Sequence, residues 1–382
     1  MNIYIKEGEN MKFTIEKNVI LENLMNVARA ISTKNVIPIL NGIKFELKEE
    51  GLYLTASDSE LTIKSFIENK EIKNVESLGN IIIQSKFIVD IIRKMPEDLI
   101  NFEVVDGLKI KISSGASEYN LNCLDSSEYP AIKLDEHKNP IIINSDLFKT
   151  IISQTVFAIS TQELRPLLTG LNFKITGDIL ECIATDSYRL AKKTVKLNVE
   201  AESAVNIVIP GKNILELDKI LTDEQDMEMH VFNNKILFKY KNITFQSNLL
   251  AGTYPNTNNL IPTEFEIMLN TNLNDYYNAI DRAALLTQSK DKNIVKMHLS
   301  NKELVINSYA SEIGKVEERV KVDCNVDTNL DISFSSKYML EALRTFKDEQ
   351  ILILLNGEVK PIVIKSTEDE SLIQLILPLK TY

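Results

Sequence analysis

Side chains that could carry catalysis are few in this sequence and lie far apart. Its three histidines are His137, His230 and His298, and none has a second histidine or a cysteine at the short spacing of a metal motif. The three cysteines form no Cys-x-x-Cys pair, and their odd number argues against both a disulfide framework and zinc. Such a set suits a reducing cytoplasm. The sequence therefore predicts no metal, no cofactor and no disulfide.

Two Gly-Lys pairs, at 211–212 and 314–315, raise the question of a phosphate-binding loop. Such a loop requires another glycine five positions earlier. Asn206 and Tyr309 stand there instead. Nucleophile-elbow and dinucleotide-binding fingerprints are missing as well. The sequence therefore carries none of these catalytic or nucleotide-binding patterns.

Two carboxylates occupy equivalent places in a repeated pattern. Ala-Ser-Asp-Ser at 56–59 returns as Ala-Thr-Asp-Ser at 184–187, 128 residues later. A period this long indicates duplicated modules rather than a short solenoid repeat. We therefore interpret Asp58 and Asp186 as residues that fix a turn at the end of a strand; the alternative is a catalytic pair.

The second copy of this pattern carries an addition. Pro-Ile-Leu-Asn-Gly-Ile-Lys-Phe at 38–45 matches Pro-Leu-Leu-Thr-Gly-Leu-Asn-Phe at 166–173, again 128 residues apart. Only the second copy continues as Tyr-Arg-Leu-Ala, at 188–191. This pattern is expected when a site is grafted onto one module of a duplicated scaffold. The bland alternative is that the leucine is a core residue and Arg189 a surface charge.

Three segments repeat one order of strands, helices and turns, which predicts an α+β fold. The predicted helices are 18–31, Ser85–Met95, Asp146–Ser160, Gly211–Leu221, Leu273–Thr287 and Ser336–Phe346. In the second helix, the residues expected to face inward are Phe87, Ile88, Ile91, Ile92 and Met95. Strands are predicted at Ile43–Lys48, Leu52–Ala56, Ile63–Glu68, Asn80–Gln84, Ile141–Asn144 and Glu264–Leu269. Hairpin turns are predicted at Asp106-Gly107, Ser114-Gly115, Asn233-Asn234 and Asn356-Gly357.

The three modules are predicted at 11–137, 138–262 and 263–382, each with two helices packed on an antiparallel sheet. Residues 1–10 precede the repeat. We expect Met11 to be the natural start and residues 1–10 to be disordered, because the residues before Met11 can be encoded by a ribosome-binding site read in frame. A short native extension is the equal alternative.

Composition excludes several classes of protein. The chain has 382 residues, of which 44% are apolar and 25% charged, as in ordinary globular proteins. No apolar run approaches the roughly 20 residues that span a bilayer, and no secretory signal is visible. We therefore expect a cytoplasmic protein without membrane contact. The net charge of −11 gives no overall attraction to nucleic acid, so any DNA contact must be local.

A resemblance to a known family rests on Met11-Lys12-Phe13, Pro38-Ile39-Leu40, Thr185–Ala191, Tyr254-Pro255 and Leu377-Pro378-Leu379. In this order and within a triplicated chain, they resemble the bacterial sliding clamps, the beta subunits of DNA polymerase III. The resemblance implies a head-to-tail homodimer that closes into a ring, with helices lining the hole and sheets outside. Duplex DNA would pass through without sequence-specific contact. DNA polymerase, the clamp loader and repair proteins would bind through short peptide motifs.

The charge distribution agrees with a ring that holds DNA by linkage. The predicted helices, taken with their flanking residues, carry a formal charge of +4, which leaves −15 for the rest of the chain. Phosphate contacts would then be weak and sensitive to salt. The candidate DNA-contacting residues are Arg29, Lys34, Arg93, Lys94, Lys149, Arg282, Arg344 and Lys347 by charge, and Lys34, Gln162 and Arg165 by matching position in the family. For any single lysine, a solvated surface charge is an equal alternative.

The resemblance also implies a peptide-binding groove between the second and third modules. By matching position, its residues are Leu168, Thr185, Ser187, Tyr188, Arg189, Leu190, Pro255, Leu260, Pro361, Ile376, Leu377, Pro378 and Leu379. Apolar walls would hold an aliphatic or aromatic anchor, while hydroxyl groups and an arginine would orient the peptide backbone. The sequence departs from the family at Asn259, where some relatives carry arginine, and at Tyr188, where many carry histidine. Both departures put the polarity of the rim and the choice of partner in doubt.

For the dimer, the resemblance matches Tyr119, Leu285 and Leu286 to apolar interface positions. Relatives place arginines beside the aromatic residue, whereas this chain has Ala116 and Glu118. The interfacial ion pairs are therefore expected to be weaker or rearranged. The candidate substitutes for the arginines are Lys109 and Lys111.

Three functions remain open on the sequence. The favoured one is a DNA-encircling clamp that makes a polymerase processive and is not itself an enzyme. The second is an enzyme with a site assembled between modules, which measurable turnover would support. The third is a scaffold built from the same modules that does not bind DNA, which failure of ring closure in solution would favour.

Overall fold

The computed structural model describes residues 6–7, 11–32, 35–106, 108–198, 203–287, 293–310 and 313–380. The chain divides into two compact units. The first unit comprises residues 1–145 and 216–249, and the second comprises residues 146–215 and 250–382. The units cut across the predicted modules, since each unit contains part of the second one.

One large sheet forms the frame of the first unit. Its strands are β1 (Lys6–Glu7), β2 (Lys12–Glu16), β3 (Gly42–Lys48), β4 (Gly51–Ser57), β5 (Leu61–Glu68), β6 (Ile72–Gln84), β7 (Leu99–Val105), β8 (Lys109–Ser114), β9 (Ser117–Asn122), β10 (Ile141–Asn144), β15 (Asp226–Val231), β16 (Lys235–Tyr240) and β17 (Ile243–Asn248). They follow the order β10-β15-β16-β17-β5-β4-β3-β6-β2-β7-β8-β9 and are antiparallel, while β1 pairs in parallel with β6. Because side chains alternate between the faces of a strand, Phe13 and Phe102 both point into the core, where their rings stack at 4.8 Å.

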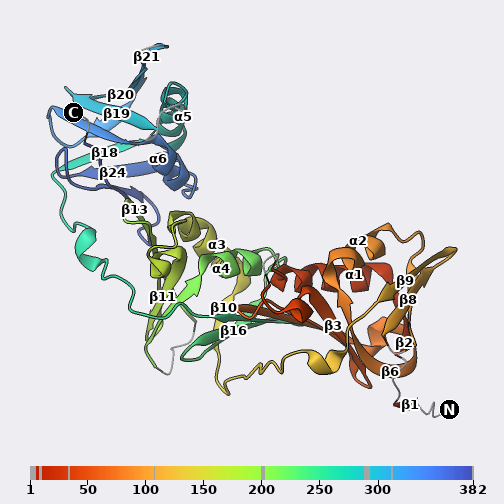
Figure 1. The fold of residues 1–382 in the computed structure, drawn as a ribbon. Coiled ribbons are helices and arrows are strands. Elements are labelled where there is room, and N and C mark those ends of the chain that lie inside the picture. The colour runs from red at the N-terminus through yellow and green to blue at the C-terminus, as the bar shows by residue number, and fades with distance from the viewer. Residues whose placement is uncertain are drawn as a thin grey trace. The chain divides into compact units, whose positions relative to one another are not determined.

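Two helices belong to the core of the first unit. They are α1 (Lys17–Val27), which continues into the 3-10 turn η1 (Ala28–Ala30), and α2 (Ser85–Lys94), and Figure 1 shows them side by side. Helix α2 buries Ile88, Ile92 and the following Met95, which fall on one helical stripe. The prediction that Phe87 faces inward is wrong, because its side chain lies beside this stripe and is 49% exposed.

Two antiparallel sheets form the second unit. Its strands are β11 (Gly170–Thr176), β12 (Ile179–Thr185), β13 (Arg189–Lys196), β14 (Val205–Pro210), β18 (Ile267–Asn272), β19 (Ile294–Ser300), β20 (Glu303–Ala310), β21 (Gly314–Val320), β22 (Val322–Cys324), β23 (Leu330–Ser335), β24 (Gln350–Leu355), β25 (Ile362–Ser366) and β26 (Leu372–Ile376). The larger sheet has the order β14-β11-β12-β13-β26-β25-β24-β18-β22, and the smaller has β21-β20-β19-β23. The helical segments that lie wholly in this unit are η5 (Val156–Ala158), η6 (Pro166–Thr169), η7 (Asn258–Leu260), α5 (Leu273–Ala284) and α6 (Ser336–Leu343). Two further helices begin in one unit and end in the other, α3 (Ser145–Thr155) and α4 (Gly211–Asp218).

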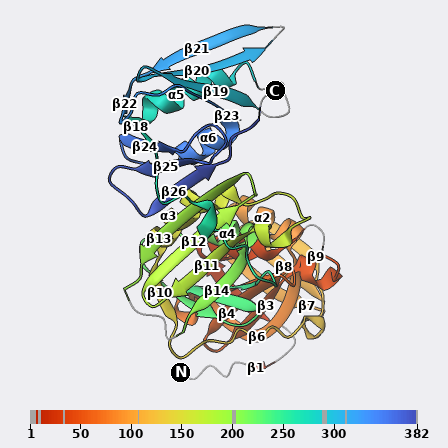
Figure 2. The same cartoon turned by 90° about the vertical axis from the view of Figure 1, so that its left-hand side faces the viewer.

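Two strand pairs cross the predicted module boundaries. In the first unit, β5 of the first module pairs with β17 of the second. In the second unit, β13 of the second module pairs with β26 of the third, and Figure 2 shows these two strands side by side. Backbone hydrogen bonds therefore join consecutive modules. The second of these pairings places the carboxyl-terminal strand beside the segment that follows Asp186.

Most of the predicted elements are present within the described residues. Each predicted helix is found and ends somewhat earlier than expected, in two cases because its last turn is a 3-10 turn. Strand β6 begins at Ile72, eight positions before the predicted start, and β18 begins at Ile267 instead of Glu264. The prediction of disorder is wrong for Lys6–Glu7, because these two residues form β1. The rest of that segment, residues 1–5 and 8–10, lies outside the described residues. None of the described helices has the length and apolar character needed to cross a membrane.

Candidate functional site

A hydrogen-bonded turn connects β12 to β13 at the position of the repeated Ala-Thr-Asp-Ser sequence. One carboxylate oxygen of Asp186, Oδ1, accepts hydrogen bonds from the backbone N–H groups of Tyr188 (2.9 Å) and Arg189 (3.0 Å). The hydroxyl of Thr185 donates to the carbonyl of Arg189 at 2.6 Å. Ser187 has a φ of 77°, a left-handed conformation that these hydrogen bonds stabilise.

The first copy of the repeat forms the same turn between β4 and β5. Oδ1 of Asp58 accepts the N–H groups of Glu60 (3.0 Å) and Leu61 (2.7 Å), and Ser59 has a φ of 75°. Ser57 donates to the carbonyl of Leu61 at 3.0 Å. The prediction that both aspartates fix strand-end turns is therefore confirmed.

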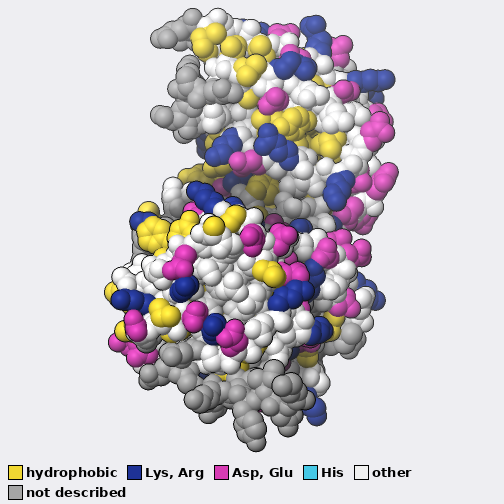
Figure 3. Space-filling view, turned by 90° about the vertical axis from the view of Figure 1, so that its right-hand side faces the viewer, with side chains coloured by type: hydrophobic (Ala, Val, Ile, Leu, Met, Phe, Trp, Pro, Cys, Tyr) yellow, Lys and Arg dark blue, Asp and Glu magenta, His cyan; other side chains and the backbone are white. Residues whose placement is uncertain are grey.

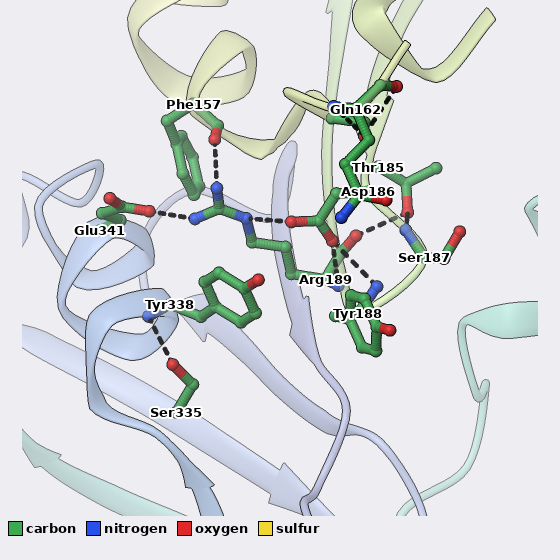
Figure 4. A network of polar contacts seen from close by, with 11 residues as sticks. Phe157, Gln162, Thr185, Asp186, Ser187, Tyr188, Arg189, Ser335, Tyr338 and Glu341 are labelled. Carbon is green, nitrogen blue, oxygen red and sulfur yellow. Dashed lines mark hydrogen bonds and ion pairs between the residues drawn. The ribbon is translucent and has the colours of Figure 1, made fainter. Parts of the chain in front are cut away.

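Arg189, which distinguishes the second copy, is buried. Its Nε donates to Oδ2 of Asp186 at 3.1 Å, its Nη2 donates to the carbonyl of Phe157 at 2.6 Å, and its Nη1 contacts Glu341 on α6 (Figure 4). The rings of Phe157 and Tyr338 lie 5.2 and 4.4 Å from the guanidinium carbon. The side chain is thus neither the surface charge of the bland alternative nor placed to orient a peptide backbone.

Two adjoining pockets lie next to this turn. The larger has a volume of about 640 Å³ and is lined by Arg165, Pro166, Leu167, Leu168, Thr185, Ser187, Ala251, Pro255, Thr257 and Leu260. The smaller, of about 320 Å³, is lined by Ser160, Gln162, Leu164, Arg165, Leu168, Asp186, Ser187 and Tyr188. The larger pocket has mainly apolar walls, whereas polar and apolar groups contribute about equally to the walls of the smaller one. This combination suits a ligand with an apolar anchor and a polar backbone.

The expected groove residues divide into three groups. Those that line a pocket are Leu168, Thr185, Ser187, Tyr188, Pro255 and Leu260. Those whose side chains are buried away from both are Arg189, Leu190 and Ile376. Those that line neither pocket but are at least partly accessible are Pro361, Leu377, Pro378 and Leu379. Of the last group, Leu377 is connected to the site, because its N–H donates to the carbonyl of Tyr188 at 2.9 Å.

Sequence reasoning missed several pocket residues. Arg165 was expected to contact DNA, yet it lines both pockets, and its Nη1 donates to the hydroxyl of Ser187 at 3.1 Å. Gln162, also expected to contact DNA, lines the smaller pocket. Pro166 and Leu167 line the larger one. The signal that could have found them is the repeated Pro-x-Leu sequence, which precedes the Asp-Ser turn by the same distance in both copies.

The candidate DNA-contacting residues differ in whether their side chains are exposed or already paired within the chain. Three of the arginines form ion pairs within the chain: Arg29 with Glu216 (3.2 Å), Arg93 with Asp90 (2.7 Å) and Arg282 with Glu318 (2.7 Å). Arg344 donates to the hydroxyl of Tyr277 at 2.9 Å, and Lys149 is half-buried. Lys94 and Lys347 are exposed, and Lys34 lies outside the described residues. On the face drawn in Figure 3, basic and acidic side chains are intermixed.

The residues expected at the dimer interface are accessible in the single chain. Tyr119 lies on β9, at one edge of the sheet of the first unit, and is 41% exposed. Leu285, just after α5 in the second unit, is 63% exposed, while Leu286 is partly buried. Lys111 forms an ion pair with Glu118 at 2.8 Å, and this contact holds the pKa of Glu118 below its usual value. Lys111 therefore already neutralises a carboxylate of its own chain.

Among the described residues, Glu136, Glu228 and His230 group their potential metal-ligating atoms within 4.8 Å of one another. The ammonium group of Lys239 occupies this position, 2.9 Å from Glu136 and 3.7 Å from Glu228. Nδ1 of His230 accepts the N–H of His137 at 2.8 Å, so the neutral ring carries its proton on Nε2, which faces Glu228 at 3.1 Å. A metal at Nε2 would need that proton on Nδ1. We therefore interpret the cluster as an ion-pair network.

Comparison with known proteins finds one family along nearly the whole chain. Models of the DNA polymerase III beta subunit match its N-terminal domain at residues 11–133, its central domain at 142–256 and its C-terminal domain at 258–380. The beta sliding clamp of Bacillus subtilis is 42% identical over 378 residues, and that of Staphylococcus aureus is 38% identical over 377, in each case covering 97% of this chain and 100% of the relative.

Solved structures agree with the sequence relatives. The crystal structure of the sliding clamp from Bacillus subtilis matches with a TM-score of 0.94 at 41% identity, covering 98% of this chain and 100% of that one. The DNA polymerase III beta chain of Streptococcus pneumoniae matches with a TM-score of 0.93 at 34% identity, covering 97% and 100%. Both sets of matches extend over nearly the full length of this chain. It therefore belongs to the DNA polymerase III beta subunit family, the bacterial sliding clamps.

Proposed function

We propose that two copies of this chain close into a ring around duplex DNA and tether a polymerase and other proteins to it. The observation that carries this proposal is the match of all three family domains, in order, along the chain. In this role the protein is a processivity factor and catalyses no reaction itself. The partners bind as peptides, and the DNA is held without sequence-specific contacts.

Ring closure is supported by two strands at sheet edges. Strand β9 ends the sheet of the first unit, and β21 ends the smaller sheet of the second. An edge strand presents backbone N–H and C=O groups that another chain can pair with. Pairing β9 of one copy with β21 of the other would make two equivalent contacts per dimer. Tyr119 on β9 and Leu285 near α5 supply apolar contact beside these edges.

Retention of DNA by enclosure is supported by the charges. The chain carries a net charge of −11, and several of its candidate DNA-contacting arginines already pair with carboxylates. Long-range attraction to phosphate is therefore weak, and what remains is screened by salt. A closed ring does not need strong contacts, because it leaves DNA only at an end or by opening.

Retention on circular and linear DNA tests this proposal. The protein is loaded onto a closed circle with a clamp loader, washed at high salt, and then the circle is cut. We expect the protein to survive the wash and to leave after the cut. Binding that is equally sensitive to salt on circles and on linear fragments would show ordinary electrostatic binding instead. A stable ring that is never retained on a circle would favour the scaffold without DNA.

The two pockets beside the 185–188 turn are the proposed peptide site. Leu167, Leu168, Pro255 and Leu260 provide apolar walls for aliphatic or aromatic anchors. An extended peptide that becomes ordered on binding loses conformational entropy, so its dissociation constant is expected to be on the order of micromolar. Polymerase, loader and repair proteins would compete for two equivalent sites in each ring.

A further inference from the structure

All three nitrogens of the Arg189 guanidinium group are engaged inside the protein. They contact Asp186, Glu341 and the carbonyl of Phe157, as Figure 4 shows. Only 8% of the residue is exposed. To reach a ligand, the side chain would have to give up at least one of these partners, two of which are carboxylates that it pairs with. Breaking a buried pair in this way is strongly destabilising.

These contacts join three separate segments of the second unit. Asp186 belongs to the turn that lines the smaller pocket, Phe157 to η5, and Glu341 to α6. Asp186 is the junction, because Oδ2 accepts the side chain of Arg189 while Oδ1 accepts the backbone N–H of Tyr188. These contacts therefore fix the backbone of the pocket wall relative to α6.

The same strand also places the carboxyl-terminal segment. Arg189 is the first residue of β13 and pairs with Ile376, the last residue of β26. The next residue, Leu377, donates its N–H to the carbonyl of Tyr188 at 2.9 Å. A shift of the 186–188 turn would therefore move both a wall of the smaller pocket and the segment that follows β26.

We infer that Arg189 is a positioning residue of the peptide site: it holds the 186–188 turn against α6 and does not contact the peptide. This inference rests on the proposed function, because it concerns the same pockets. Lysine cannot replace arginine here, since a single ammonium group cannot reproduce the planar arrangement of three donors that reaches all three partners.

Calorimetric titration of the full chain with a Gln-Leu-Ala-Leu-Phe peptide tests the inference. Arg189→Lys and Glu341→Gln are both expected to weaken binding about tenfold, which corresponds to roughly 1.4 kcal/mol. Glu341 lines neither pocket, and its contact with Arg189 connects it to the turn. If Arg189 contacted the peptide directly, Glu341→Gln would release its guanidinium group and leave affinity unchanged or higher. That outcome would overturn the inference.

Lys193→Gln is the matched control. Lys193 lies on the same strand, is 6% exposed and forms an ion pair of 2.6 Å with Asp369, so its loss also removes a partly buried contact between β13 and the third module. We expect this variant to lower the melting temperature and to bind the peptide as the wild type does. Equal weakening by Lys193→Gln would mean general loosening and would also overturn the inference. Failure of the wild type to bind would instead contradict the proposed peptide site.

Discussion

The guanidinium group of Arg165 donates a hydrogen bond of 3.1 Å to the hydroxyl of Ser187, and both residues line both pockets. This contact lies where the larger, mainly apolar pocket adjoins the smaller one. Arg165 therefore forms part of the wall that a bound peptide has to pass along. A role at this site differs from the DNA contact that sequence matching suggested for the same residue.

Replacement of Arg165 separates the two roles. We expect Arg165→Ala to weaken peptide binding about tenfold, because it removes wall area from both pockets and opens them to solvent. Retention on circular DNA at increasing salt should match that of the wild type. The reverse result, with normal peptide affinity and DNA retention that is more sensitive to salt, would return Arg165 to the DNA-contacting set.

The dimer interface is tested by charge insertion. Leu285→Asp combined with Leu286→Asp should give monomers by light scattering, because each lost apolar anchor weakens an interface by about 2 kcal/mol or more. Ile179→Asp is the control. Ile179 is also an accessible apolar residue, at 38% exposed, but it lies on β12 and not at the proposed dimer interface. The control should remain dimeric. A wild type that is monomeric at micromolar concentration would contradict the dimer itself.

Truncation at the carboxyl terminus tests the peptide site. Deleting residues 377–382 removes the segment held by the carbonyl of Tyr188 but keeps Ile376, which is buried and paired on both sides within the sheet. We expect the dimer to persist and peptide binding, measured by calorimetry, to be lost. Unchanged affinity after this deletion would show that the segment after β26 takes no part in the site.

From the ion pair between Lys193 and Asp369, we expect the stability of the fold to depend on pH in the acid range. Burial alone would raise the pKa of Asp369, but the hydrogen bonds from Lys193 and Ser371 outweigh it and hold this pKa below the usual 3.8. A carboxylate with a lowered pKa in the folded state stabilises the fold above its unfolded pKa, and this stabilisation is lost as pH falls through the folded pKa. Stability should therefore decline as pH drops below about 3.8.

Denaturant unfolding of the wild type and of Asp369→Asn, from neutral pH down through this window, measures the contribution. The variant should be less stable than the wild type at neutral pH. It should also lose less stability in acid, because its amide does not titrate. Equal losses in the two proteins would show that Asp369 does not contribute to acid sensitivity.

The sequence by itself determined the repeated elements and the turns. Helix positions follow from apolar spacing that is local to each segment, and the roles of Asp58 and Asp186 follow from hydrogen bonds to N–H groups two and three residues away. Such contacts form wherever the local sequence allows them, so a pattern of neighbours is enough to predict them. Phe87 shows the limit of such prediction. Its side chain is exposed, because α2 buries fewer of its apolar residues than the sequence pattern indicates.

Only the tertiary structure decided what the arginines do. The partner of Arg165 lies 22 positions along the chain, and Glu341 lies 152 positions from Arg189. The second of these separations is bridged where β13 pairs with β26, in a register that places Arg189 opposite Ile376. A shift of one residue in that register would turn the side chains of one strand to the other face of the sheet. The role of Arg189 therefore depends on the packing of distant strands, which local sequence patterns do not encode.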